Sequence, residues 1–206
     1  MPFLYKIGVA LVRVWCRLCG CRIRGRENIP ADTALLIIAN HTSYNDPILL
    51  AVAFPQHITF IAKEQFLRRS HTRWLYGAAL GAVFLNKEES DLSALRTSIK
   101  LMKGGRTVGI FPEGRRNFDQ KISEFMPGAA FIALKAGVPV LPVAINNSRD
   151  LLRFWKRNVA VNIGRPILLE QATKTSQEKL AEKTACFQQA IKDLYIENEH
   201  LLNISR

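Results

Sequence analysis

Short apolar runs rich in β-branched residues recur along the chain and alternate with stretches of helical periodicity. Each run is four to eight residues long, the usual length of a buried strand, and polar or turn-forming residues separate it from the next. We predict strands at residues 34–39, 58–62, 82–85, 108–111, 138–145 and 159–163. Strands that alternate with helices predict an α/β fold, with a central, mostly parallel or mixed sheet flanked by helices.

Two of the helical stretches have recognisable ends. The first is predicted to stop at the glycine pair 104–105, because glycine favours the conformation that follows a helix. Its apolar face consists of Leu92, Leu95, Ile99 and Met102. The second is predicted to open at Thr175 and Glu178, which have the spacing of a capping box. Its apolar face consists of Leu180, Phe187, Ile191 and Leu194.

The opening residues form a separate pattern, an amphipathic helix with a wide apolar surface. Lys6, Arg13 and Arg17 fall within about 20° of one line on such a helix. The apolar positions that cover most of the remaining surface are Phe3, Leu4, Ile7, Val9, Leu11, Val14 and Trp15. Because the cations leave no apolar run of about 18 residues, the segment is not predicted to cross a bilayer.

Such a surface is typical of a helix that lies in the membrane interface with its cations toward the lipid headgroups. A terminal helix packed on the domain's own core, with its basic stripe in solvent, would give the same pattern. We favour the interface, because a helix that is apolar over most of its circumference needs more cover than one domain face usually supplies. The chain of 206 residues is long enough for one sizeable core. We therefore divide it into a membrane-associating helix at 1–20 and one domain at 21–206.

The chain carries 29 Lys and Arg residues against 17 Asp and Glu residues, a formal charge of +12. Such a surplus attracts polyanions, whether nucleic acid, anionic lipid surfaces or phosphorylated substrates. Residues 66–80 mix basic and aromatic side chains, which suits a membrane interface or a nucleic-acid groove. Cys16 and Cys19 form a C-x-x-C without a second pair of ligands, so we expect no zinc site. With no signal-peptide pattern and no disulfide framework, a reducing cytosolic compartment is expected.

Two turns that follow predicted strands are unusually polar. NHTSYNDP (40–47) follows the run at 34–39, and FPEGRRN (111–117) follows the run TVGI. In α/β folds, ligands usually bind beyond the carboxyl ends of the strands. Both turns are therefore candidates for the functional site.

In the first turn, Asp46 and Pro47 have the pattern of a helix start, with Asp46 as the N-cap. His41 has no helical role, and five positions would separate it from Asp46 by about 140° on a helix. In a turn, however, Asp46 can accept a hydrogen bond from one ring nitrogen of His41 and leave the other nitrogen free to take a proton. This arrangement is a general base with its orienting group, although a capped helix beside a buried histidine would have the same spacing.

Four segments, read in order, resemble the sequence blocks of the glycerolipid acyltransferases, the PlsC-type 1-acyl-sn-glycerol-3-phosphate (lysophosphatidic acid) acyltransferase family. They are NHTSYNDP (40–47), GAVFLNK (81–87), FPEGRRN (111–117) and GVPVLPVAI (137–145). The resemblance covers roughly residues 22 to 167. It identifies the domain at 21–206 as an acyltransferase domain.

The resemblance implies a reaction as well as a fold. His41, oriented by Asp46, would remove the proton of the acceptor's hydroxyl, which then attacks the thioester of acyl-carrier protein or acyl-coenzyme A. The product would be phosphatidic acid, made in phospholipid biosynthesis. No metal or redox cofactor is expected, because the thioester is already activated, and no G-x-S-x-G nucleophile motif occurs in the sequence.

The substrate-binding residues that the resemblance implies are Asn40, Lys87, Glu113, Gly114, Arg115, Arg116 and Pro139. Arg116 offers a planar fork suited to the oxygens of the acceptor's phosphate. The sequence departs from the family pattern where Lys87 replaces an arginine, Arg115 a threonine and Met126 a lysine. These departures leave the catalytic pair intact, but they keep another lysolipid or glycerol-3-phosphate open as the acceptor.

The expected partners are a lysophospholipid acceptor, a thioester of acyl-carrier protein or coenzyme A, and an anionic membrane surface, but not nucleic acid. The expected location is the cytoplasmic face of the cell membrane, as a peripheral or monotopic protein. Two other classes of protein stay open: a non-catalytic basic protein that binds anionic lipid or nucleic acid, and a thioesterase or lipid hydrolase that passes the acyl group to water. The first leaves the His41 and Asp46 turn and the FPEG turn unexplained.

Overall fold

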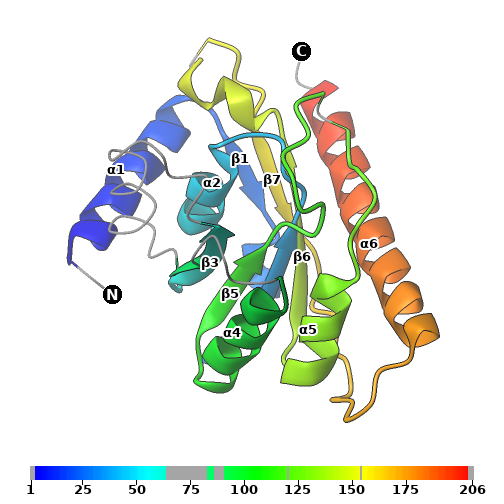
Figure 1. Ribbon diagram of the computed structural model, residues 1–206. Helices are drawn as coiled ribbons and strands as arrows, with labels where there is room; N and C mark the ends of the chain where they lie inside the picture. Colours follow the sequence, from blue (N-terminus) through cyan, green and yellow to red (C-terminus); the bar gives the residue numbers. More distant parts are fainter. Residues whose placement is uncertain (1–2, 64–82, 86–90, 120, 154, 204–206) are drawn as a thin grey trace.

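A seven-stranded sheet forms the centre of the protein, with helices on both faces (Figure 1). The computed structural model describes residues 3–63, 83–85, 91–119, 121–153 and 155–203. The strands are β1 (Arg22–Arg24), β2 (Leu36–Ala39), β3 (Ile58–Lys63), β4 (Val83–Leu85), β5 (Thr107–Ile110), β6 (Val140–Asn146) and β7 (Ala160–Ile163). Their order across the sheet is β1-β7-β6-β2-β5-β3-β4, and every neighbouring pair is parallel except β6 with β7. The predicted α/β fold with a mostly parallel or mixed sheet is confirmed.

All six predicted strands are present, each within two residues of its predicted bounds. The sequence does not predict the seventh, β1. Its three residues, Arg-Ile-Arg, contain no apolar run, and they belong to the sheet because their backbone pairs with β7, with Arg22 opposite Ala160. A pairing made by the backbone at the edge of a sheet leaves little trace in the side-chain pattern.

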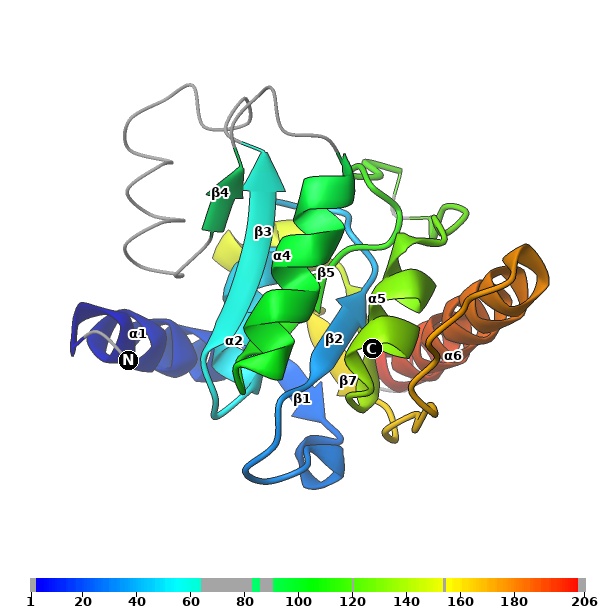
Figure 2. The same cartoon turned by 60° about the horizontal axis from the view of Figure 1, so that its bottom comes forward.

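The helices form one layer on each side of the sheet (Figures 1 and 2). α1 (Phe3–Leu18) and α2 (Asp46–Ala53) lie on one side, and α4 (Asp91–Lys103), α5 (Gly128–Ala136) and α6 (Gln177–Asn203) lie on the other. Within β2, Ile37 and Ala39 pack in the cluster of α1 and α2, whereas Leu36 and Ile38 pack in the cluster of the other three helices. Because β2 is buried on both faces, its sequence is a continuous apolar run, and this run is what predicted the strand.

The predicted end of α4 is confirmed, since the helix stops at Lys103 before the glycine pair. The predicted start of α6 is wrong by one residue. The Lys179 amide donates to Ser176 Oγ at 3.2 Å and the helix begins at Gln177, so Ser176 rather than Thr175 caps it. The sequence does not predict α5, because most of its residues are buried and the helix shows no amphipathic period.

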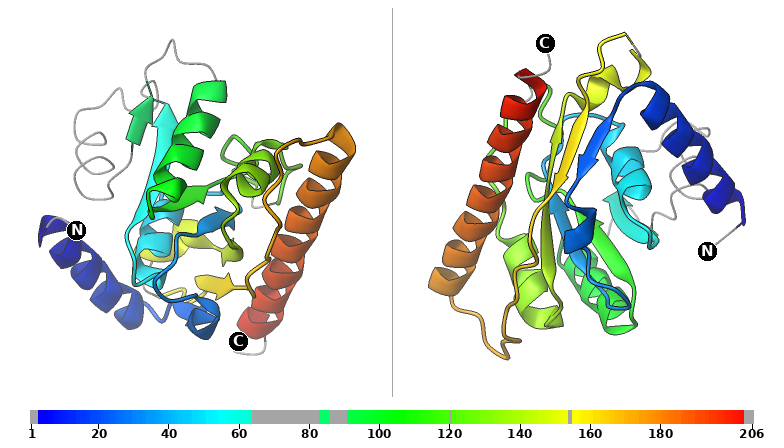
Figure 3. Two further views of the ribbon diagram at one scale, coloured as in Figure 1. Left: turned by 90° about the horizontal axis from the view of Figure 1, so that it is seen from below. Right: turned by 180° about the vertical axis from the view of Figure 1, so that it is seen from behind.

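α1 packs one side on the domain and exposes the other (Figure 3). Tyr5 and Cys16 are buried on the inner side. The outer side carries an apolar stripe at helical spacing, Ile7, Leu11, Val14 and Leu18. Leu11 is 67% exposed and Leu18 68%, so the body of the domain leaves the apolar stripe of α1 uncovered.

The basic stripe of α1 is only partly in solvent. Lys6 and Arg17 are exposed, but Arg13 is half-buried and donates to the carbonyl of Val52 at 3.3 Å, which also accepts a hydrogen bond from Arg26. Both interpretations of the sequence, cations toward lipid headgroups or a basic stripe in solvent, therefore differ from the structure at Arg13. Its guanidinium is drawn inward because the last carbonyls of α2 have no partner within the helix.

Two further predictions concern membrane contact. Among the described residues, no helix combines the length and the apolar character needed to span a membrane. The basic and aromatic segment at 66–80 lies outside the described residues.

Candidate active site

The polar turns meet because the strands before them are neighbours. β2 lies between β5 and β6, with Ile38 opposite Ile110 on one side and Ala39 opposite Val143 on the other. All three strands are parallel, so the segments that follow them leave the sheet at the same edge. The turn 40–45, the loop 111–127 and the segment after Asn146 are thereby brought together.

The turn after β2 brings His41 to Asp46. Nδ1 of His41 lies 2.8 Å from Oδ2 of Asp46, and the same oxygen accepts the backbone amides of Thr42 at 2.7 Å and Ser43 at 2.8 Å. The Asp46 side chain is fully buried, whereas that of His41 is 16% exposed. The pairing predicted from the spacing is confirmed, and the carboxylate holds both the ring and the backbone of the turn.

The start of α2 differs in detail from the prediction. Asn45 is the N-cap, Asp46 is the first helical residue and Pro47 follows it. Asp46 is not the cap because its carboxylate reaches back to the amides of the turn instead of forward to those of the helix. An N-cap side chain bonds amides two or three residues later, which Asp46 does not.

The loop after β5 fixes His41 from the other side. The His41 ring stacks on Phe111, with ring centroids 4.0 Å apart and planes 15° apart. The His41 amide donates to Glu113 Oε1 at 2.8 Å, and its carbonyl accepts the Asn117 amide at 2.7 Å. No described residue offers a hydrogen bond to Nε2 of His41, so this nitrogen is the one available to a substrate.

Two residues predicted to bind substrate are instead occupied with the protein's own backbone. Glu113 is 5% exposed and accepts the amides of His41 and Ser123. Burial raises the pKa of the Glu113 carboxyl above its usual value, although these two amides act in the opposite direction. Asn40 is fully buried, and its side-chain amide both donates to and accepts from the backbone of Ile145 at 2.8 Å. Both side chains hold the backbone at and around the turn 40–45.

Two arginines lie beside the turn. Arg116 stacks over the ring of Tyr44, with its Cζ 3.6 Å from the ring centroid, and lies 6.0 Å from the ring of Phe118. Arg149 donates from Nε to the carbonyl of Thr42 at 3.3 Å, and its Cζ is 5.1 Å from the Phe118 centroid. Both arginines thus lie near the ring of Phe118.

Sequence reasoning predicted Arg116 and missed Arg149. Arg149 belongs to none of the four blocks, and it follows β6 in η4 (Ser148–Leu152). Its position just beyond a predicted strand, at the edge where the other polar turns lie, is the signal that identifies it.

The remaining predicted substrate-binding residues have different positions. Gly114 turns the FPEGRRN loop with a left-handed φ of 68°, and a Cβ at this position would lie 2.5 Å from Sδ of Met126. Arg115 is exposed on the same loop. Pro139 precedes β6 at the opposite edge of the sheet, so the structure does not bring it to the turn. Lys87 lies outside the described residues.

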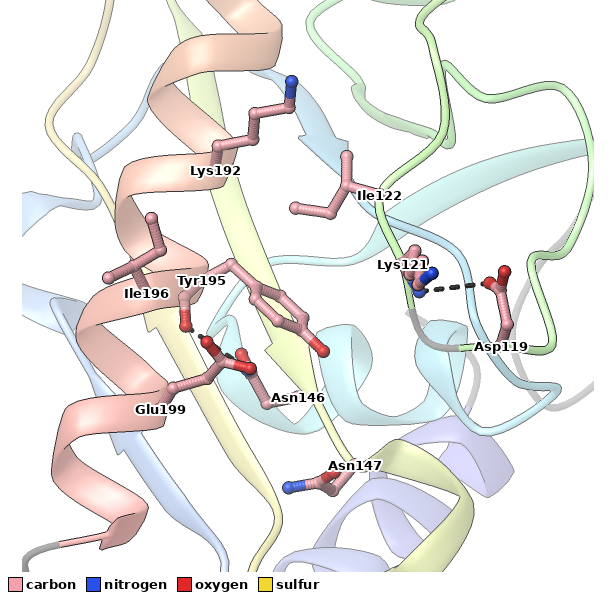
Figure 4. A pocket seen from close by; sticks show the side chains of 9 residues that line it. All are labelled: Asp119, Lys121, Ile122, Asn146, Asn147, Lys192, Tyr195, Ile196 and Glu199. Atoms are coloured by element: carbon pink, nitrogen blue, oxygen red, sulfur yellow. Dashed lines mark hydrogen bonds between the residues drawn. The ribbon is translucent and has the colours of Figure 1, made fainter.

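A cleft of about 610 Å³ opens next to these turns, between α6 and the segment around Lys121 (Figure 4). Asn146 and Asn147 form its floor at the end of β6, and Lys192 and Tyr195 line it from α6. Burial, and secondarily the charge of Glu199, raises the pKa of Tyr195 to about 12. The cleft adjoins the turn 40–45 through Asn117, whose side chain donates to the Lys121 carbonyl while its backbone amide donates to the His41 carbonyl.

Comparisons with known proteins agree with this geometry. A family model described as "Acyltransferase" matches residues 20–146, more than half of the chain. The 1-acyl-sn-glycerol-3-phosphate acyltransferase of Bacillus subtilis is 32% identical over 202 residues, which cover 93% of this chain and 96% of that protein. The enzyme of the same name from Borreliella burgdorferi is 30% identical over 177 residues, 84% of this chain and 69% of that protein.

A solved acyltransferase structure is also similar to this chain in its three-dimensional fold. The crystal structure of the 1-acyl-sn-glycerophosphate (LPA) acyltransferase PlsC from Thermotoga maritima has a TM-score of 0.68 and 29% sequence identity, over 96% of this chain and 80% of that chain. The residues matched by the family model include the His41 turn and the FPEGRRN loop. This chain belongs to the acyltransferase family.

Proposed function

We propose that this protein transfers a fatty acyl group from a thioester of acyl-carrier protein or coenzyme A to the free hydroxyl of 1-acylglycerol-3-phosphate, giving phosphatidic acid. The observation that carries the proposal is the pairing of His41 Nδ1 with a fully buried Asp46, 2.8 Å apart, at the edge where the polar turns meet. The similar proteins that are named as 1-acyl-sn-glycerol-3-phosphate acyltransferases support the acceptor.

In the proposed reaction His41 acts as general base. Asp46 accepts a hydrogen bond from Nδ1–H, which keeps the ring proton on Nδ1 and leaves Nε2 unprotonated and able to take the proton of the acceptor's hydroxyl. As that proton moves to Nε2, the hydroxyl oxygen attacks the thioester carbonyl carbon and a C–O bond forms. The C–S bond then breaks, and the departing thiolate takes the proton back from the imidazolium. Atoms and charges balance without a covalent acyl-enzyme or a metal or redox cofactor.

The acceptor's phosphate is proposed to bind the two arginines beside the turn. Guanidinium groups donate two parallel hydrogen bonds to phosphate oxygens, and Arg116 and Arg149 both lie next to Phe118, close to Thr42 and Tyr44. Arg115 and Lys87 supply further positive charge from the FPEGRRN loop and the second block.

The proposed location is the cytoplasmic face of the cell membrane, where the protein is peripheral or monotopic. The uncovered apolar stripe of α1 supports this proposal, because a helix with one exposed apolar side and adjacent cations partitions into the headgroup region. An anionic surface would also attract a chain with a formal charge of +12.

The test compares the purified protein with its His41→Ala variant on oleoyl-lysophosphatidate in detergent micelles. Acyl-carrier-protein and coenzyme A thioesters are supplied in parallel, and labelled phosphatidate is measured. We expect phosphatidate from the intact protein and a loss of about a hundredfold or more in the variant, and the productive thioester identifies the donor.

Other results would contradict parts of the proposal. Equal rates in both proteins would overturn the role of His41. Transfer only to glycerol-3-phosphate or another lysolipid would overturn the acceptor. Fatty acid released without any acceptor would indicate a hydrolase, and binding of anionic lipid without transfer by either protein would indicate a non-catalytic role.

A further inference from the structure

The segment between β6 and β7, residues 147–159, connects the catalytic turn to α1. We call it the β6–β7 loop. At its start, Ser148 Oγ lies 3.2 Å from Thr42 Oγ1, next to His41. In its middle, the Leu151 carbonyl accepts a hydrogen bond from the Trp15 indole of α1 at 3.0 Å. Figure 1 and the right-hand view of Figure 3 both show it against the C-terminal end of α1.

The β6–β7 loop exposes large apolar side chains beside the apolar stripe of α1. Leu152 is 70% exposed and Trp155 66%. Of the thirteen exposed large hydrophobic side chains among the described residues, α1 contributes five and the loop two more. The members are Ile7, Leu11, Val14, Trp15 and Leu18 from α1 and Leu152 and Trp155 from the loop. Exposed apolar side chains that cluster in this way mark a surface that contacts something apolar.

A network around one carboxylate holds the β6–β7 loop in shape. Asp150 is 8% exposed and accepts hydrogen bonds from Arg153 at 3.2 Å, Lys156 at 3.1 Å and Asn158 at 3.0 Å. The side chain of Asn147 in turn donates to the carbonyl of Asn158. Leu152 and Trp155 are therefore displayed by a closed, internally bonded loop.

The charge of the β6–β7 loop selects the kind of surface it contacts. The loop contains four basic residues and one acidic residue. Basic side chains interleaved with leucine and tryptophan suit the headgroup region of an anionic bilayer, where indole rings and cations are both favoured. A protein partner would favour fewer charges among the apolar side chains.

We propose that the β6–β7 loop is a second membrane-contacting element, which inserts Leu152 and Trp155 into an anionic lipid surface next to α1. Because the loop begins at the catalytic turn, its contact with the bilayer holds the mouth of the site at the height of the lipid headgroups. The inference rests on the membrane association in the proposed function and adds the residues that orient the site toward it.

The experiment measures vesicle binding of the full chain by flotation. Vesicles contain equal parts of phosphatidylglycerol and phosphatidylcholine, with phosphatidylcholine alone as a comparison. The variants are Leu152→Ser, the double variant Leu152→Ser/Trp155→Ser and, as a matched control, Leu168→Ser. Leu168 is 76% exposed but lies next to Ile167, which pairs with Val140 at the opposite edge of the sheet.

We expect the double variant to bind anionic vesicles about tenfold more weakly than the intact protein does. The single variant should have an affinity between those of the intact protein and the double variant, and the control should bind as the intact protein does. Acyl transfer to a short-chain lysophosphatidate below its micelle concentration should be unchanged in the double variant, whereas transfer to acceptor in vesicles should fall with binding. The vesicle measurement tests membrane contact by the loop even if no acyl transfer is found. The inference about the loop and the proposed acyl transfer can therefore be disproved independently.

Brominated lipids supply a second measurement that does not depend on how the serine variants fold. They should quench more tryptophan emission in the intact protein than in Trp155→Phe, since bromine reaches only inserted rings. Equal quenching, or equal vesicle binding by the double variant and the intact protein, would overturn the inference. A dimer that dissociates in the double variant with vesicle binding unchanged would assign the surface to a second copy of the chain instead.

Discussion

The turn 40–45 and the surface formed by α1 and the β6–β7 loop lie close together but are built in opposite ways. In the turn, one buried oxygen of Asp46 lies within hydrogen-bond distance of three nitrogen atoms, and two further side chains, Glu113 and Asn40, hold the backbone. On the surface, Leu11 is 67% exposed and Leu152 70%, so both side chains make few packing contacts.

This difference in burial matches the two functions proposed for the turn and for the surface, general-base catalysis and membrane contact. The proposed general base, His41, needs a fixed ring and tautomer, and the groups that support it are buried and make more than one hydrogen bond. The proposed membrane contact needs only apolar area and charge at the right height, so its large apolar side chains are exposed, while hydrogen bonds hold the backbone that carries them. Substitutions in the turn should therefore have large effects on turnover, whereas those on the surface should have small effects on turnover in solution.

The largest expected effect is that of Asp46→Asn. The amide cannot accept from Nδ1–H and from two backbone amides as the carboxylate does, and it favours the wrong tautomer of His41. We expect kcat to fall by about 10³ to 10⁴, measured as steady-state turnover on micellar lysophosphatidate. A fall of less than about tenfold, in a variant whose circular dichroism is unchanged, would mean that the carboxylate does not orient the base.

Asn40→Ala should have a smaller effect, and on stability as well as on rate. The substitution leaves the amide and carbonyl of Ile145 without their side-chain partner inside the sheet edge, so we expect a loss of about 1–3 kcal/mol in the free energy of unfolding. Urea unfolding measures it. Gln189→Ala on the exposed side of α6 is the control and should change stability by no more than about 0.5 kcal/mol. Equal changes in the free energy of unfolding of both variants would mean that Asn40 does not stabilise the turn.

Arg149→Met tests the arginine that belongs to no sequence block. Loss of a charged donor to phosphate should raise the KM for lysophosphatidate about tenfold and leave kcat nearly unchanged. Arg165→Met, an exposed arginine beyond the end of β7, is the matched control and should change neither constant. A fall in kcat at constant KM would instead mean that Arg149 acts only by holding the carbonyl of Thr42.

The sequence alone predicts those parts of the molecule that local pattern determines. Six strands and the end of α4 follow from apolar runs and glycine, and the His41 and Asp46 pair follows from its spacing, its turn and the resemblance. These features have short-range causes: strand length, backbone conformation and the reach of two side chains.

The parts that the sequence does not predict depend on contacts distant along the chain. β1 exists through its backbone pairing with β7, and the inward turn of Arg13 depends on the uncapped carbonyls of α2. Glu113 has the same motif position whether it binds substrate or backbone, and only the approach of the His41 amide decides between them. Arg149 becomes a candidate only when β6 is known to lie beside β2.

The smallest expected effect concerns the carboxylate that shapes the β6–β7 loop. Burial by itself raises the pKa of Asp150, but the hydrogen bonds from Asn158 and Lys156 and the charges of Lys156 and Arg153 outweigh it and hold the pKa below its ordinary value of 3.8. A carboxyl whose pKa is lower in the folded than in the unfolded chain stabilises the fold above the unfolded value. That contribution is lost as the pH falls through the folded value.

Asp150→Asn removes this pH-dependent contribution while it keeps the size of the side chain. At neutral pH the variant should be less stable by no more than about 1 kcal/mol, because Arg153 and Lys156 are largely in solvent, with side chains 56% and 40% exposed. The difference in unfolding free energy between the two proteins should stay constant down to the ordinary value of 3.8 and shrink below it. Urea unfolding at a series of pH values measures this. If the difference shrank already near neutral pH, a group other than Asp150 would be titrating. If it persisted at the acid end, the loop would be held by its hydrogen-bond geometry rather than by charge.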